Sequence, residues 1–250
     1  MNRILKLSSV FMFFSAQGIL VAQAQAESLK DFETTLIQKY YQSSCSSRNE
    51  CDQYNENISN AIETKIKKDP TSFTYAFPQL AEKNMLKIHY SPDRKIKFYT
   101  MDISGGGTMR DSTNLIQFKG KNSPITQDLA KVGFIDKIAQ VKIDNRDVYL
   151  ITSVFIGSTC SRSYHINSFV VNNDQFVPKQ VFQTKTQNLD SINVENDCQD
   201  WERPLQDFIR ISQDLKNVDI MLINASGKLS NHYLRYQKTN HGYRYIGQTK

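Results

Sequence analysis

The stretch IDKIAQVKIDNRDVYLITSVFI, residues 135–156, decides the fold of this chain. Its two halves, 135–143 and 148–156, have the two-residue periodicity and the apolar content of strands. Between them lies Asp144-Asn145-Arg146-Asp147, which is a turn sequence because Asp and Asn bond their own backbone and tolerate positive φ. The stretch therefore predicts two antiparallel strands joined by a hairpin.

The same pattern extends along the chain in both directions. Residues 163–171 and 176–182 flank Asn172-Asn173-Asp174, a strong hairpin signal, and complete a meander of four strands. Further strands are predicted at 86–90, 95–103, 113–119, 208–211, 218–223, 229–237 and 243–247. Long helical patterns do not alternate with these strands, which argues against a parallel α/β sheet. We expect a mainly β fold of antiparallel meanders, arranged as an incomplete propeller-like array or a sandwich.

The strand predicted at 95–103 has one side that is expected to face solvent. Ile96 and Phe98 fall on one face and Lys95, Lys97 and Tyr99 on the other, since side chains alternate along a strand. Lysines on such a face are most simply solvated, or protect an edge against pairing.

The region before the first strand has a helical pattern. Side chains recur at helical spacing in two segments, at Leu29, Phe32, Leu36, Ile37 and Tyr40 and again at Tyr54, Ile58, Ala61 or Ile62, and Lys65 or Ile66. Asp69-Pro70 ends the second segment, because the residue before a proline avoids the helical region. We expect residues 27–70 to form a helical hairpin and residues 71–250 to form the antiparallel β domain.

The first 26 residues have the pattern of a secretory signal peptide. Arg3 and Lys6 provide a positive start, 4–21 is an apolar run, and Ala24-Gln25-Ala26 matches a small-x-small cleavage site. After cleavage behind Ala26, no apolar run approaches the roughly 18 residues that a membrane helix needs. We therefore expect a periplasmic or secreted protein without a transmembrane segment.

The charge balance is mild. The chain has 31 Lys and Arg against 25 Asp and Glu, a formal charge of +6, and loss of the signal would remove two of the positive charges. Nucleic-acid binders concentrate far more positive charge on one face. A nucleic-acid partner is therefore not expected.

The four cysteines indicate disulfides. An even number in an exported chain favours pairing, and four cysteines allow three connectivities. We favour Cys45–Cys51, which are close in sequence between the two predicted helices, and Cys160–Cys198, which lie in the strand-rich part. No Cys-x-x-Cys or Cys/His spacing indicates a metal site. An oxidising compartment also disfavours a catalytic thiol.

Two segments resemble a group of β-rich exported bacterial proteins. The first is SPDRKIKFYTMDISGGGTM, residues 91–109, with a Ser-Pro-Asp turn, a strand ending in Tyr-x-x-Asp, and Gly-Gly-Thr-Met. The second is YLITSVFIGSTCSRSYHINSFVV, residues 149–171, which is similar to the strand pair that follows in that group. The resemblance covers about half of the mature chain and implies a β-rich exported protein. No activity is established for the group, so the resemblance assigns no catalytic residue.

Three consecutive glycines, Gly105, Gly106 and Gly107, lie between two predicted strands. A Walker loop and a dinucleotide fingerprint both need another glycine spacing, ahead of a helix, so no cofactor is expected. The simplest interpretation is a connection whose residues need positive φ.

The alternative is a binding loop for an anion, with Thr108 and Arg110 alongside the glycines and Arg162 joining from the next meander. Residues 104–112 exceed the length that a hairpin requires, and long ordered loops are often functional. This loop is therefore the candidate binding site.

The sequence contains no familiar catalytic motif, and its four histidines, at 89, 165, 232 and 241, are isolated from one another. The leading hypothesis is a non-catalytic periplasmic binding protein, immunity- or inhibitor-like, with an envelope protein as its partner. Two alternatives stay open. One is an envelope hydrolase that acts on saccharide or peptidoglycan with Asp102, Asp111 or Arg110. The other is a sensor of a small ligand or glycan at the glycine loop.

Overall fold

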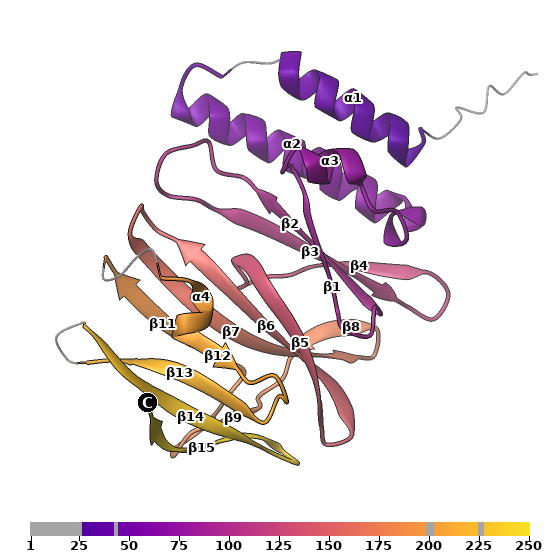
Figure 1. Ribbon diagram of the computed structural model, residues 1–250. Helices are drawn as coiled ribbons and strands as arrows, with labels where there is room; N and C mark the ends of the chain where they lie inside the picture. The colour runs from indigo at the N-terminus through magenta and orange to yellow at the C-terminus, as the bar shows by residue number, and fades with distance from the viewer. Residues whose placement is uncertain (1–26, 43–44, 199–202, 225–227) are drawn as a thin grey trace, which may run out of the picture.

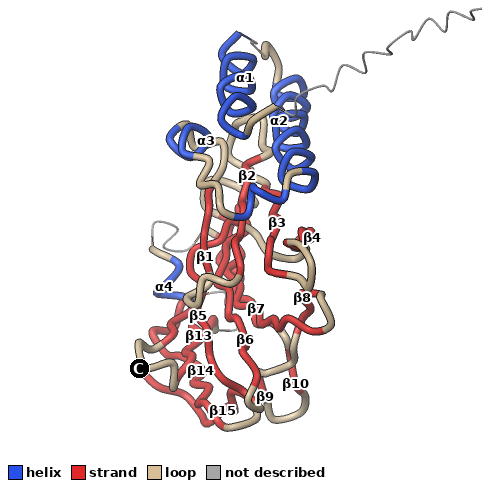
Figure 2. The backbone as a smooth tube through the Cα atoms, turned by 90° about the vertical axis from the view of Figure 1, so that its right-hand side faces the viewer, coloured by secondary structure: helices blue, strands red, loops and turns tan. Residues whose placement is uncertain are grey.

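The computed structural model describes residues 27–42, 45–198, 203–224 and 228–250. The predicted signal peptide, residues 1–26, lies outside the described residues. A layer of helices is followed by three sheets, A, B and C, each packed on the next (Figure 1). Figure 2 shows the N-terminal helices at one end of an elongated molecule and sheet C at the other. The predicted mainly β fold of antiparallel meanders with N-terminal helices is thereby confirmed.

The helical layer begins with α1 (Leu29–Gln42) and α2 (Arg48–Lys68). Ser47 caps α2 by accepting a hydrogen bond from the Glu50 backbone N–H at 3.3 Å, which satisfies a donor left open at the helix start. A 3₁₀ turn, η1 (Pro70–Phe73), and a short helix, α3 (Pro78–Glu82), lead to the first strand. No helix among the described residues has the length and apolar character needed to cross a membrane.

Sheet A is a meander of four antiparallel strands: β1 (Lys87–Tyr90), β2 (Ile96–Asp102), β3 (Ser112–Lys119) and β4 (Pro124–Asp128). Both of its faces are buried. Tyr99 and Met101 pack with Ile62 and Ile66 of α2 on the helix side. The alternating positions Ile96, Phe98, Ile116 and Phe118 pack against sheet B.

Sheet B contains the stretch from which the fold was predicted. Its strands are β5 (Phe134–Ile143), β6 (Arg146–Ile156), β7 (Ser161–Asn172), β8 (Gln175–Pro178) and β11 (Ser191–Asp197). β7 pairs with β6 on one side and with both β8 and β11 on the other. The strands β8 and β11 therefore pair with different parts of the same edge of the long strand β7.

Sheet C closes the molecule. Its strands are β9 (Phe182–Gln183), β10 (Asn188–Leu189), β12 (Ile209–Ile211), β13 (Asn217–Ile223), β14 (Leu229–Thr239) and β15 (Gly242–Thr249), with the short helix α4 (Leu205–Phe208) before β12. The β9–β15 pair is parallel and all others are antiparallel. Aliphatic and aromatic side chains fill the space between sheets B and C, where the rings of Tyr164 and Phe208 stack with their centroids 4.0 Å apart.

One strand prediction is wrong in its extent. Residues 176–182 were expected to form a single strand, but β8 ends at Pro178 and Phe182 begins β9 in another sheet. Proline has no N–H with which to continue a ladder, so the chain leaves sheet B there.

The expectation for Lys97 is also wrong. Its side chain is only 1% exposed, because the helical layer covers that face of sheet A. Nζ donates hydrogen bonds to the carbonyls of Ser72, at 2.8 Å, and Tyr75. It also lies 4.7 Å from the ring centroid of Tyr99 and 5.3 Å from that of Phe77. Burial lowers the pKa of Lys97 to about 8.

The structure contains two disulfides, Cys45–Cys51 and Cys160–Cys198, with the pairing expected from sequence. The first closes the connection between α1 and α2. The second ties the start of the β7 hairpin to the end of β11. Two disulfides fit a protein that folds in an oxidising compartment.

Candidate functional site

The glycine loop, residues 103–111, joins the end of β2 to the start of β3. Asp102 organises its base. One carboxylate oxygen accepts hydrogen bonds from the backbone N–H of Ser104, at 3.0 Å, and from the Ser104 hydroxyl. The other oxygen accepts from Arg110, whose Nε lies at 3.0 Å. A single carboxylate therefore holds both ends of the loop together.

Neighbouring elements hold the loop from outside. The backbone N–H of Gly105 donates to the carboxylate of Asp52 on α2, and the Asn55 amide donates to the Ser104 carbonyl at 2.5 Å. On the opposite side, the backbone N–H of Arg110 donates to the carbonyl of Ile156 in sheet B at 3.0 Å. The loop thus bridges the helical layer and sheet B.

The tip of the loop projects from this fixed base. Gly106 and Gly107 have φ values of +98° and +86°, and a Cβ built on either would meet no atom within 4 Å. Their requirement is therefore conformational, as the sequence predicted. Thr108 is exposed, and Met109 is 53% exposed, one of the few large apolar side chains that the fold leaves in solvent.

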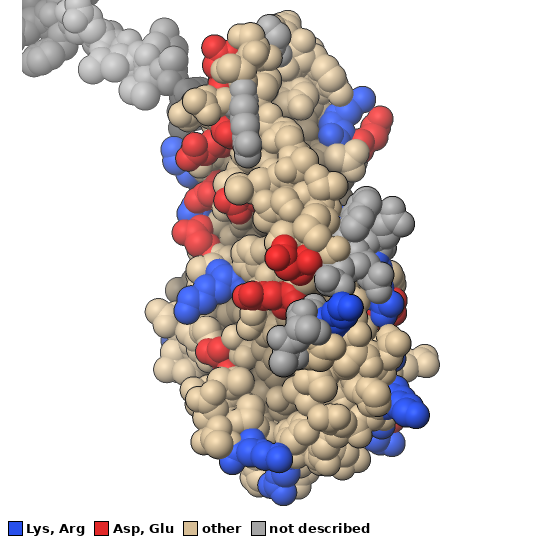
Figure 3. All heavy atoms as spheres, turned by 90° about the vertical axis from the view of Figure 1, so that its left-hand side faces the viewer, with Lys and Arg blue, Asp and Glu red and all other residues tan. Residues whose placement is uncertain are grey.

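The guanidinium of Arg110 is already engaged. It pairs with Asp102 and lies 5.2 Å from the ring centroid of Phe134 on β5, although half of the side chain is exposed. Its charge is therefore largely compensated within the protein. In the upper and middle parts of the face shown in Figure 3, basic and acidic side chains are interspersed.

Arg162 lies close to this region, as expected. In sheet register Arg110 is opposite Ile156, and Ile156 is opposite Arg162, so the three side chains point to the same face. Arg162 is partly buried. Burial raises the pKa of the neighbouring Tyr164 hydroxyl, and the positive charge of Arg162 opposes part of that rise. The two arginines are thus separated by one strand, and Arg162 belongs partly to the core between sheets B and C.

A cavity of about 420 Å³ opens beside the loop. Its lining combines charged groups, Lys87, Asp102 and Arg110, with apolar surface from Leu86 and Phe134. The loop region therefore has a space that could hold a small ligand, in addition to its exposed tip.

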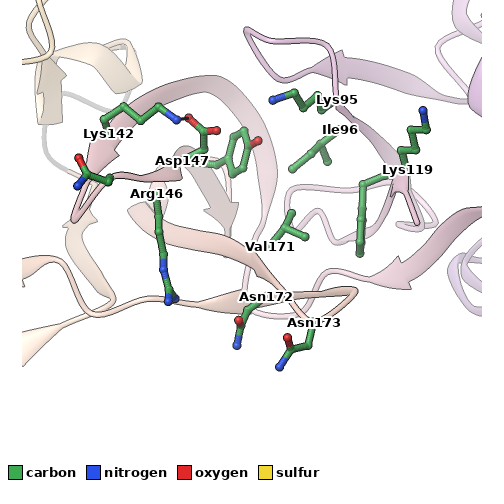
Figure 4. Close-up of a pocket in the computed structure, with 12 residues that line it drawn as sticks. Lys95, Ile96, Lys119, Lys142, Arg146, Asp147, Val171, Asn172 and Asn173 are labelled. Atoms are coloured by element: carbon green, nitrogen blue, oxygen red, sulfur yellow. Dashed lines mark ion pairs between the residues drawn. The ribbon is translucent and has the colours of Figure 1, made fainter. Parts of the chain in front are cut away.

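Sequence reasoning missed a second and larger cavity, of about 460 Å³, at the opposite end of the β2–β3 hairpin. We call it the basic cavity. Its charged lining residues are Lys95, Lys119, Lys142, Arg146 and Asp147, and its other lining residues are Ile96, Phe118, Asn145, Tyr149, Val171, Asn172 and Asn173. The basic side chains surround its rim, while Ile96 and Val171 point toward its middle (Figure 4).

The basic cavity is assembled from three hairpins of two sheets. Lys95 and Lys119 flank the paired residues Ile96 and Phe118 at one end of sheet A. The turns after β5 and β7 in sheet B supply the remaining groups. Both turns were predicted, but their asparagines and arginine were taken only as turn formers. No sequence signal places these three hairpins side by side, since that depends on how sheets A and B stack.

A serine–histidine pair was also missed by sequence reasoning. The Ser163 hydroxyl lies 2.8 Å from Nε2 of His165 on the same face of β7, and burial lowers the pKa of His165. A catalytic imidazole needs a further group on its second nitrogen. In the part of the chain that the structure describes, Nδ1 of His165 has no hydrogen-bond partner. The pair therefore lacks the arrangement of a catalytic triad.

Comparison with protein-family models, curated proteins and solved structures found no significant match to this chain. The interpretation of function therefore rests on the geometry of the two cavities and the loop.

Proposed function

We propose that this protein is an exported, non-catalytic binding protein, immunity- or inhibitor-like, that contacts an envelope protein through the glycine loop. The main support for the proposal is that the tip of the loop is exposed while groups from three neighbouring parts of the chain hold its base in place. Asp102 at the end of β2, Asp52 on α2 and Ile156 in sheet B each hold it. A loop held in one conformation loses less entropy on binding than a mobile loop does.

The composition of the tip supports a protein partner. Met109 is 53% exposed and precedes the half-exposed Arg110, and methionine and arginine are both enriched in protein interfaces. The glycines let the backbone approach a partner closely, because they add no side chain to the tip.

The hydrogen bonds of Asp102 and Asp111 make these two carboxylates less suitable as the catalytic groups of a hydrolase. A glycosidase needs one carboxylic acid that can release its proton and a second carboxyl group across the scissile bond. The Asp102 carboxylate is instead committed to Arg110 and Ser104. Asp111 accepts a hydrogen bond from the backbone N–H of Ser112 at 2.8 Å.

Site-specific cross-linking tests the protein-partner proposal. A photo-reactive amino acid is placed at Met109 in the exported protein, and an equal substitution at Ile246, which is 54% exposed on sheet C, serves as the control. We expect a cross-link to one protein species from position 109 and none from position 246. No cross-link at 109, or the same products from both positions, would contradict the proposal.

Export itself has a direct test. N-terminal sequencing of the purified periplasmic protein should begin at Glu27, without lipid on the chain. Material that retains Met1 would contradict the predicted cleavage behind Ala26.

A second candidate function is supported by the cavity of about 420 Å³ beside the loop. Its volume lies in the range of small-molecule sites, which favours the sensor alternative. A ligand there would contact Lys87, so Lys87→Ala should abolish its binding. A protein partner at the tip should bind Lys87→Ala as it binds the wild type.

A further inference from the structure

We propose that the basic cavity binds an anionic saccharide, that is, a sugar that carries a phosphate or a carboxylate group. This site lies at the other end of the β2–β3 hairpin from the glycine loop and is independent of the protein partner proposed above. Its volume of about 460 Å³ suits a ligand of one or two sugar rings, since small-molecule sites generally occupy about 300–1,000 Å³.

Uncompensated positive charge is the first observation that supports this site. Lys95 pairs with Asp93 at 3.3 Å, and Lys142 pairs with Asp147 at 2.8 Å. Lys119 and Arg146 are exposed and form no ion pair with any of the described residues. The rim therefore has two cations whose charge is not compensated by an ion pair with any described residue.

The two acids that flank Arg146 in its turn are both engaged by other groups. Asp147 pairs with Lys142 at 2.8 Å. Asp144 lies in the same turn, but its carboxylate is 2.6 Å from Nδ1 of His241 in the β14–β15 turn of sheet C. Its backbone N–H also donates to the Asn240 carbonyl at 2.8 Å. The turn between β5 and β6 is therefore fixed against sheet C through Asp144, while Arg146 lines the cavity.

The amide side chains are the second observation. Asn145, Asn172 and Asn173 line the cavity, and their amides make no hydrogen bond within the described chain. Asn145 and Asn173 have φ values of +61° and +49°, which accounts for asparagine at these turn positions. Asn172 is not among the residues with positive φ, so backbone geometry does not account for it.

These amides distinguish a sugar from a simple anion. A phosphate or carboxylate needs hydrogen-bond donors, which Lys119 and Arg146 already supply. An asparagine amide offers an acceptor as well as two donors, and sugar hydroxyls can use both kinds of group. Apolar surface at the middle of the cavity, including the 42% exposed Val171, matches the C–H face of a sugar ring.

Isothermal titration calorimetry with four compounds tests the proposal: glucose 6-phosphate, glucuronate, glucose and inorganic phosphate. We expect the two anionic sugars to bind at least about tenfold more tightly than either glucose or inorganic phosphate, a difference of about 1.4 kcal/mol. Comparable affinity for glucose 6-phosphate and inorganic phosphate would overturn the saccharide assignment. Absence of heat with all four compounds would overturn the site.

Variants test whether the named residues are responsible. The double variant Lys119→Gln/Arg146→Gln should weaken glucose 6-phosphate binding by about tenfold or more. The control Lys137→Gln/Lys216→Gln removes the same charge from exposed positions outside the cavity and should bind like the wild type. Equal weakening in both double variants would show that net charge alone attracts the ligand, which contradicts a defined site.

Asn172→Ala separates the sugar from its anionic group. This variant should lower affinity for glucose 6-phosphate but leave the weak binding of inorganic phosphate unchanged. The backbone at 172 needs no special residue, so a circular dichroism melt should match that of the wild type. Unchanged glucose 6-phosphate affinity in a folded Asn172→Ala variant would contradict the role of the amides.

Discussion

The two ends of the β2–β3 hairpin differ in whether acidic groups of the protein compensate their positive charge. At the glycine loop, Arg110 pairs with Asp102 at the end of β2 and lies over the ring of Phe134. At the basic cavity, Lys119 and Arg146 have no acidic partner among the described residues. The sequence drew attention to the first end, because three glycines and an arginine stand out there. The cations at the second end remain available to bind a ligand.

Whether a basic side chain is structural or available for binding therefore depends on its partners and not on its being lysine or arginine. Lys97 is the extreme case, since two backbone carbonyls and several aromatic rings surround its ammonium group. A cation with intramolecular partners contributes to shape, whereas a cation without them can contribute to binding. This division between structural and available cations can be tested by mutation at each of them.

Lys97 should make the stability of the protein depend on pH. Its pKa is about 8 in the folded state against an ordinary value of 10.5, so between these values unfolding takes up a proton. The contribution of Lys97 to stability is therefore smallest below pH 8 and increases as pH rises, by up to about 1.4 kcal/mol per pH unit. Urea unfolding, measured at intervals from about pH 7.5 to about pH 9.5, gives the free energy of unfolding as a function of pH and so checks this dependence.

Lys97→Met is the matched variant for this measurement, because methionine retains the apolar stem without the titrating group. The difference in stability between wild type and variant should shift with pH in favour of the wild type. Burial and the hydrogen bond to Glu33 raise the pKa of Tyr75 to about 12, which lies above this pH range and is common to both proteins. A difference that stays constant with pH would show that Lys97 does not titrate in this range.

Gly106→Ala should cost about 1–2 kcal/mol, because φ is +98° and a Cβ is disfavoured there even without a clash. Gly157→Ala is the control, since its Cβ would make only ordinary contacts, the nearest being 3.6 Å from the Ser161 carbonyl oxygen. Thermal unfolding of both variants provides the comparison. Equal loss at both positions would mean that loop geometry at Gly106 is not held as described.

The pairing of Asp102 with Arg110 should have a measurable but small coupling energy. Both side chains are partly exposed, and ion pairs of that kind contribute about 0.2–1 kcal/mol. A double-mutant cycle with Asp102→Ala and Arg110→Ala, followed by urea unfolding, isolates this coupling. A coupling energy of zero would mean that Arg110 is as available as the cavity cations.

Arg146→Ala should have the smallest effect on stability, within about 0.5 kcal/mol, because the side chain is exposed and has no ion-pair partner in the described chain. The same urea measurement compares it with Arg110→Ala. A larger loss at Arg146 than at Arg110 would reverse the proposed division between the two ends of the hairpin.

Local patterns predicted much of this architecture. The turn sequences at Asp144-Asn145 and Asn172-Asn173 placed both hairpins of sheet B, and these residues have positive φ in the structure at 144, 145 and 173. The helical spacing around Leu29 and Ile62 predicted the face that packs on sheet A. Such signals succeed because turn chemistry and burial period are properties of a few neighbouring residues.

Features that depend on stacking could not be predicted in this way. Lys97 was expected in solvent, since nothing in residues 95–103 shows that α2 and η1 cover that face. β11 was missed because SINVEND is largely polar, yet it completes an edge of sheet B. The basic cavity was missed for the same reason, because its groups come from three hairpins that meet only when sheets A and B pack.

The most direct test of the division is an NMR titration of the ¹⁵N-labelled protein with glucose 6-phosphate. We expect chemical-shift changes at Lys119, Arg146, Asn172 and Asn173, which line the basic cavity, and none at Arg110 in the glycine loop. Changes centred on Arg110, or spread evenly over exposed lysines throughout the molecule, would contradict this division.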